Sequence, residues 1–212
     1  MLEEQFFRIL FDRIENIDTL MPDINRAADA IIEAVTHGGR MMVYDERGQL
    51  SQESNYRCAG LRLPRPAVTP EGDLMDVTPL DVVVIYSHLP ATEKSLRALE
   101  KARTAGCWIV AVCPKIRRGE TPDGPTLAAQ AHLHIDDLSD AEGTVRPPGW
   151  KNSIASTTAI MNDVILWVLH SQIIDRMTAR GMTPGVLRGG HLKGGSEFNH
   201  AVVDSLFNAR GW

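Results

Sequence analysis

Residues 81–86 read Asp-Val-Val-Val-Ile-Tyr and form the clearest predicted strand of the 212-residue chain. An unbroken β-branched run of this length is typical of a strand that is buried on both faces of a parallel sheet. A second such run, Cys-Trp-Ile-Val-Ala-Val-Cys, occupies 107–113, and a helical pattern at 92–105 separates the two. A strand, a helix and a second buried strand in this order predict a parallel α/β sheet.

The rest of the chain extends this alternation in both directions. Apolar residues spaced three and four apart predict further helices, which we expect at 2–17, 24–36, 50–60, 152–180 and 197–208. Shorter apolar runs predict further strands, which we expect at 40–45, at 131–135 and, because of its prolines as an edge strand, at 62–68. Met21-Pro22-Asp23 is expected to break the first helix from the second. The predicted fold class is α/β, a doubly wound three-layer αβα sandwich with about five mainly parallel strands.

The charge balance argues against a nucleic-acid partner. The formal net charge is −5 and the pI is near 5.8, whereas proteins that bind DNA or RNA usually present a basic face. The densest positive run, Lys115, Arg117 and Arg118, is small enough to hold one phosphate or to be a solvated loop. The longest apolar stretch, 160–174, is too short and too polar to span a bilayer, so no membrane partner is expected.

The cysteines favour a reducing compartment. Cys58, Cys107 and Cys113 are odd in number and form no Cys-x-x-Cys pair. The chain starts with an acidic segment that lacks the features of a signal peptide. These observations predict a cytoplasmic protein.

Three polar segments are candidates for ligand binding, because ligands of open α/β sheets bind beyond the carboxyl ends of the strands. Helix starts add free N–H groups and a positive dipole end. The segment after the first strand contributes Asp45, Arg47, Gly48, Gln49 and Ser51. The segment after the clearest strand contributes Ser87, His88 and Thr92. The head of the long helix contributes Ser153, Ser156, Thr157 and Thr158. Each segment also has a purely structural reading, as a polar loop or a helix cap.

Other titratable residues have weaker patterns. Glu53 and Arg57 stand four apart on a predicted helix, where they form either a surface ion pair or, for Glu53, a general base. His132 and His134 share one face of a strand, but no third metal ligand is evident. His191 and His200 flank a glycine-rich loop and are acid or base candidates. The serine hydrolase, P-loop and dinucleotide motifs are absent.

Taken in order, these segments resemble the sugar isomerase (SIS) domain family, and within it the phosphosugar-binding branch related to phosphoheptose isomerases. The resemblance covers nearly the whole chain. Four stretches carry it, at 39–48, 53–61, 82–92 and 194–199.

Two loops depart from the family pattern. The first loop of the family usually reads Gly-x-Gly-x-Ser, where this chain has Asp45, Arg47 and Gln49. The second usually reads Ser-x-Ser-Gly-x-Thr, where Leu89 and Pro90 replace the inner serine and glycine. The resemblance therefore implies either altered phosphate binding or another polar sugar derivative as ligand.

The resemblance also implies a function. It suggests a single SIS domain over 1–212, with N-terminal helices at 1–36, an αβα core at 40–180 and a C-terminal loop and short helix at 181–212. It implies a sugar phosphate or sugar derivative as ligand, aldose–ketose isomerisation without a metal or other cofactor, and a homodimer or homotetramer. Glu53 matches the family's base, with His200, His191 or His88 as its partner. A non-catalytic sugar-phosphate sensor and a structural paralogue without ligand remain as alternatives.

Overall fold

The computed structural model describes residues 1–116, 124–140 and 143–212. Five strands form one parallel sheet in the order β2-β1-β3-β4-β5. Their bounds are Met41–Asp45 (β1), Pro64–Pro66 (β2), Val82–Tyr86 (β3), Trp108–Cys113 (β4) and Leu133–Asp136 (β5). The predicted strands are therefore present, with the proline-rich strand β2 at one edge.

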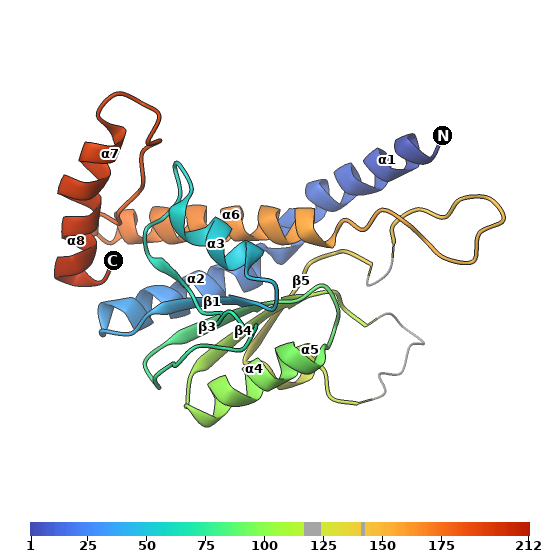
Figure 1. The fold of residues 1–212 in the computed structure, drawn as a ribbon, viewed down its shortest axis with the longest axis horizontal. Coiled ribbons are helices and arrows are strands. Elements are labelled where there is room, and N and C mark those ends of the chain that lie inside the picture. The colour runs from blue at the N-terminus through green and yellow to red at the C-terminus, as the bar shows by residue number, and fades with distance from the viewer. Residues whose placement is uncertain (117–123, 141–142) are drawn as a thin grey trace.

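Helices cover both faces of this sheet (Figure 1). Their bounds are Leu2–Glu15 (α1), Met21–Thr36 (α2), Gln49–Tyr56 (α3), Glu93–Thr104 (α4), Leu127–Gln130 (α5), Thr158–Ala179 (α6), Gly195–Phe198 (α7) and Asp204–Arg210 (α8). Alternate residues of β3 point to opposite faces, as strand geometry requires. Val82, Val84 and Tyr86 pack with α2 and α6. Val83 and Ile85 pack with α4 and α5. This arrangement confirms the three-layer α/β prediction.

Several predicted boundaries were wrong. Residues 16–20 form a 3₁₀ helix that leads directly into α2, so Pro22 does not break the chain but lies in the first turn of α2, where its missing N–H costs nothing. The last helix begins at 195 rather than 197 and contains a π-helical turn at 199–203. The short helix α5 was not predicted.

The long helix α6 begins six residues later than expected. Ile154 forms an isolated antiparallel bridge with Val145, and Ala155 adopts a left-handed backbone conformation with a φ of 58°. Both features are incompatible with a helix, so the segment before Thr158 runs as an irregular loop. The polar head of the predicted helix is therefore a loop that approaches the carboxyl edge of the sheet.

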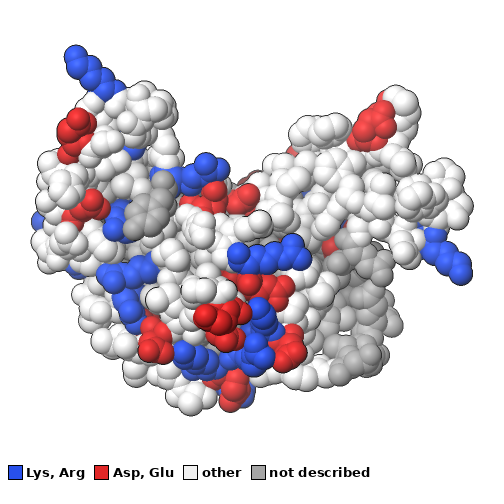
Figure 2. Space-filling view, viewed as in Figure 1, with Lys and Arg blue, Asp and Glu red and all other residues white. Residues whose placement is uncertain are grey.

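No helix in the described part of the chain is both long and apolar enough to cross a membrane. On the face that carries α4, basic and acidic side chains are interspersed (Figure 2). Arg97, for example, contacts both Glu93 and Asp73. This face therefore has no broad basic surface of the kind that binds a nucleic-acid backbone.

A buried carboxylate holds the amino end of the sheet together. The side chain of Asp81, of which 1% is exposed, accepts hydrogen bonds from the backbone and the guanidinium of Arg40 and from the backbone N–H of Thr78. Burial raises the pKa of Asp81, but the bonds from Arg40 and Thr78 outweigh it and the pKa lies below its usual value. This carboxylate is therefore ionised, and both of its oxygens accept hydrogen bonds.

We expect Asp81→Ala to lower the free energy of unfolding by about 2 kcal/mol, because it leaves buried donors without an acceptor. Urea denaturation at pH 7 measures the effect. Asp76→Ala is the matched control, because the side chain of Asp76 is fully exposed and forms a surface ion pair with Lys101; this variant should unfold like the parent protein. Equal stability of both variants would contradict the assignment.

Candidate functional site

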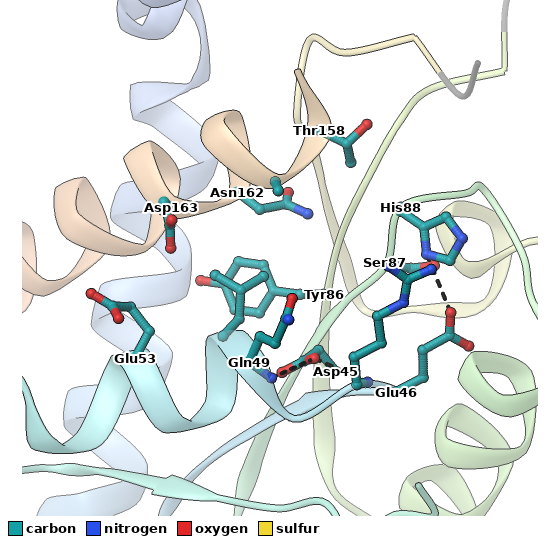
Figure 3. Close-up of a pocket in the computed structure, with 13 residues that line it drawn as sticks. Asp45, Glu46, Gln49, Glu53, Tyr86, Ser87, His88, Thr158, Asn162 and Asp163 are labelled. Atoms are coloured by element: carbon teal, nitrogen blue, oxygen red, sulfur yellow. Dashed lines mark hydrogen bonds and ion pairs between the residues drawn. The ribbon is translucent and has the colours of Figure 1, made fainter. Parts of the chain in front are cut away.

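A cavity of about 200 Å³ opens beyond the carboxyl ends of β1 and β3, between α3 and the start of α6 (Figure 3). Its walls come from four parts of the chain. The lining residues are Asp45, Glu46, Arg47, Gln49, Leu50, Glu53, Tyr86, Ser87, His88, Thr158, Ala159, Asn162 and Asp163. The site therefore lies where ligands of open α/β sheets bind.

Hydrogen bonds to the carboxylate of Asp45 hold the turn after β1 together. Oδ1 of Asp45 accepts hydrogen bonds from the backbone N–H groups of Arg47 and Gln49, both at 3.1 Å, and Oδ2 accepts one from Ser51 at 2.8 Å. Gly48 has a φ of 72°, which a glycine adopts without strain and which turns the chain into α3. Asp45 therefore caps α3 and occupies the amide groups at its start.

The turn after β3 is closed in a similar way. The hydroxyl of Thr92 accepts a hydrogen bond from the N–H of Ser95 as the cap of α4, and it donates to Oε2 of Glu46 at 3.1 Å. Nδ1 of His88 lies 3.2 Å from Oε1 of the same glutamate. The hydroxyl of Ser87 accepts from the N–H of Leu89. Glu46 thus joins the two turns across the cavity wall.

The third segment contributes Thr158, which opens α6 and lines the cavity. Its hydroxyl contacts those of Ser139 and Ser156, each at 2.9 Å. The buried Thr157 instead accepts a hydrogen bond from Arg13, which also pairs with Asp140 at 2.6 Å. This network fixes the loop before α6 to α1.

Two carboxylates face the cavity from different helices. Glu53 extends from α3 and pairs with Arg57, and Asp163 extends from α6 (Figure 3). Burial raises the pKa of Asp163, the charge of Glu53 raises it further, and Arg57 lowers it in part. Asp163 therefore holds its proton more readily than an exposed aspartate does.

Two buried polar groups of the cavity wall have no hydrogen-bond partner among the described residues. They are the hydroxyl of Tyr86 and Oδ1 of Asn162. Tyr86 is 1% exposed and Asn162 is 3% exposed. Burial, with Asp163 nearby, raises the pKa of the Tyr86 hydroxyl, so it stays protonated and can donate. Buried polar groups are normally paired, so a ligand is the natural partner for both.

The structure brings together seven of the residues that the sequence analysis selected. Those that line the cavity are Asp45, Arg47, Gln49, Glu53, Ser87, His88 and Thr158. Those that do not line it are Gly48, Ser51, Thr92, Ser153, Ser156, Thr157, His191 and His200. Thr92 and Ser156 lie directly behind the lining, because each contacts a residue that belongs to it.

The histidines of the sequence analysis have other surroundings. His200 is exposed and lies 3.7 Å from Asp204, and His191 is exposed beside Gly189. Nδ1 of His132 accepts the N–H of Ile109, while Nε2 of His134 contacts the carbonyl of Cys113. No group of three residues suited to a metal occurs within the described ranges. Arg117 and Arg118 lie outside these ranges.

The sequence analysis missed Tyr86, Asn162 and Asp163 as site residues. Asn162 stands four residues after Thr158, so both occupy one face of α6. Polar residues at this spacing in an apolar helix were a usable signal. No sequence pattern marked Asp163 or Tyr86, because only the packing of α3 against α6 and β3 brings these side chains to one cavity.

Comparison with known proteins supports one fold. No family model matches the chain. A UPF0309 protein of Streptomyces griseus is 22% identical over 237 aligned positions, covering 95% of this chain and 94% of its own length. A UPF0309 protein of Caldanaerobacter subterraneus is 24% identical over 229 positions, covering 92% of this chain and 93% of its own length.

Solved structures extend the comparison. Phosphoheptose isomerase GmhA of Neisseria gonorrhoeae matches with a TM-score of 0.55 and 13% identity, covering 84% of this chain and 100% of that chain. A phosphoheptose isomerase of Francisella tularensis matches with a TM-score of 0.53 and 15% identity, covering 81% and 94%. The resemblance drawn from the sequence is thus confirmed at the level of architecture, and the chain has the sugar isomerase (SIS) fold.

Proposed function

We propose that the chain binds a carbohydrate derivative in the cavity between α3 and α6 and interconverts its aldose and ketose forms. The observation that carries this proposal is the pair of carboxylates, Glu53 and Asp163, that face one polar cavity at the carboxyl edge of the sheet. Two solved structures that share the fold are named phosphoheptose isomerases, and this name states that they act on a sugar derivative. We further propose that residues 1–212 form one SIS domain.

The two carboxyls divide the proton transfers of such a reaction between them. Glu53, which forms an ion pair with Arg57, removes the proton from the carbon next to the carbonyl and returns it to the former carbonyl carbon. Asp163, whose pKa is raised by burial and by Glu53, donates a proton to the carbonyl oxygen as the enediol forms. It takes a proton back from the neighbouring hydroxyl when the new carbonyl forms, so no proton is gained or lost overall.

The unpaired groups of the wall orient the substrate. The hydroxyl of Tyr86 and Oδ1 of Asn162 would each gain a partner from a sugar hydroxyl. A preorganised donor next to the reacting oxygens also stabilises the charge of an enediolate. Because Tyr86 and Asn162 are buried, they do this without reorganising at the moment of reaction.

We also propose that the chain assembles into a homodimer or homotetramer. Helix α1 projects from the body of the molecule (Figure 1) and leaves Phe7 and Phe11 more than half exposed. A shallow apolar groove on α6 runs past Ile160, Val164 and Trp167. Exposed apolar surface of this kind is typical of a subunit interface, and a monomer in light scattering would contradict the assembly.

Proton exchange with solvent tests the isomerase proposal. The protein is incubated in D₂O with pentoses, hexoses and heptoses and with their phosphate esters, and NMR follows the proton on the carbon next to the carbonyl. We expect one sugar to exchange this proton and to yield its aldose or ketose counterpart. Binding in thermal shift without exchange would show the non-catalytic sensor instead, and the absence of both would overturn the proposal.

A further inference from the structure

We propose that the cavity selects a sugar that carries no phosphate, and that an amino sugar binds most tightly because its ammonium group meets an acidic wall. This inference rests on the proposed function and names the ligand class of the same site. Three features carry it: backbone amide groups at the start of α3 and in the turn before α4 already donate to the protein's own side chains, the charged lining residues are mostly acidic, and the unpaired group of α6 is an acceptor.

The first anion position, at the start of α3, is filled by the protein itself. An anion at a helix start is held by several backbone N–H groups and by the positive end of the dipole. Here three such groups, from Arg47, Gln49 and Ser51, donate to the carboxylate of Asp45. Asp45 is 7% exposed. A phosphate would have to displace a buried carboxylate that belongs to the strand end.

A carboxylate, that of Glu46, also lies beside the second anion position, at the start of α4. Glu46 accepts the hydroxyl proton of Thr92 and contacts His88 on the same turn. The backbone N–H groups of Leu89, Thr92 and Ser95 donate to hydroxyls of their own turn. The donors that would grip a phosphate are therefore used within the turn, next to a negative charge that repels it.

The charge of the lining points the same way. The carboxylates of Asp45, Glu46 and Glu53 outnumber Arg47, which is the only lysine or arginine among the described residues that line the cavity. A sugar phosphate brings up to two further negative charges into this wall. At separations of a few ångströms each like-charge contact of this kind costs on the order of fivefold in affinity, even in water. An ammonium group reverses the sign of every one of these contacts.

The unpaired group on α6 needs a donor rather than an acceptor. Oδ1 of Asn162 is buried without a hydrogen bond from the part of the chain that the structure describes, and Asn162 lines the cavity beside Asp163. Sugar hydroxyls and an ammonium group donate hydrogen bonds, whereas an ionised phosphate only accepts them. Asn162 thus offers an acceptor to a ligand hydroxyl or ammonium group, beside the hydroxyl of Tyr86.

Calorimetric titration with matched ligands tests the inference. The probes are glucosamine and glucosamine 6-phosphate, and glucose and glucose 6-phosphate, each measured at low salt and pH 7. We expect glucosamine to bind best and each phosphate ester to bind at least about tenfold more weakly than its parent sugar. Tighter binding of either ester would overturn this inference alone, whereas no binding of any of the four sugars would also count against the proposed function.

A charge-neutral variant sharpens the result. Glu46→Gln keeps an oxygen that can accept from Thr92 but removes the charge beside the start of α4. We expect it to improve the affinity for glucosamine 6-phosphate relative to glucosamine by about fivefold. Glu100→Gln is the control, because Glu100 is exposed on α4, pairs with Arg103 and does not line the cavity. An unchanged ratio in Glu46→Gln would overturn the electrostatic argument.

Discussion

Glu53→Gln is expected to lower kcat of the proposed isomerisation by about 10²- to 10⁴-fold, which is the usual contribution of a general base. The amide has nearly the same shape as the carboxylate but cannot accept the proton from carbon. Glu53 lines the cavity and is not buried in the core, so the variant should fold and bind an uncharged sugar with affinity close to that of the parent protein. Turnover and calorimetric titration of the same preparation separate the two effects.

Asp163→Asn is expected to act differently from Glu53→Gln. Asparagine still donates a hydrogen bond but can neither give nor take a proton, so the variant should turn over more slowly and should lose the pH dependence that the raised pKa of Asp163 imposes on kcat/KM. Asp175→Asn is the matched control, because Asp175 is exposed on the same helix and lies outside the cavity. Full turnover in Glu53→Gln would remove the carboxylate pair from the mechanism.

The sheet was predictable because its strands carry their own signal. A buried parallel strand needs apolar side chains on both faces, so β3 and β4 appear in the sequence as unbroken runs and their bounds were predicted within one residue. The start of α6 was not predictable in the same way. Its position depends on the bridge between Ile154 and Val145, a contact that local propensity does not encode.

The site was predictable only where it follows the strands. Asp45 ends β1 and Ser87 directly follows β3, so their place at the edge of the sheet follows from topology alone. The partner of Glu53 did not follow, because no local pattern shows that α6 brings Asp163 to it. The sequence also shows that the loops lack hydroxyls of the family pattern. It does not show that the carboxylate of Asp45 accepts hydrogen bonds from the backbone N–H groups at the start of α3.

Two buried titratable side chains, those of His170 and Asp137, are expected to give opposite pH dependences of stability. Burial lowers the pKa of His170 to about 4, and neither of its ring nitrogens has a hydrogen-bond partner within residues 1–116, 124–140 and 143–212. Burial raises the pKa of Asp137 to about 6, against the hydrogen bonds of Ser139, which lower it. Unfolded chains have values near 6.5 and 3.8. Both groups therefore change their proton affinity strongly on folding.

The signs of the two contributions follow from linkage. The stability that a neutral His170 allows is complete above about pH 6.5 and is lost as the pH falls toward 4, because only the unfolded chain takes up the proton. The contribution of Asp137 is complete below about pH 3.8 and is lost as the pH rises through 6, because only the unfolded chain releases the proton. Between pH 4 and 6 the two slopes oppose each other and nearly cancel.

Single substitutions should therefore expose one slope each. In His170→Leu the remaining Asp137 should make stability fall as the pH rises from 4 to 6, and in Asp137→Asn the remaining His170 should make it rise, each by about 2 kcal/mol relative to the parent protein. Urea denaturation at half-unit steps measures both, and His191→Gln, at an exposed histidine, should follow the parent curve. The other titrating groups are common to all these proteins, so they drop out of the comparison. Parallel curves for the two core variants would mean that at least one of these groups keeps its ordinary pKa in the folded state.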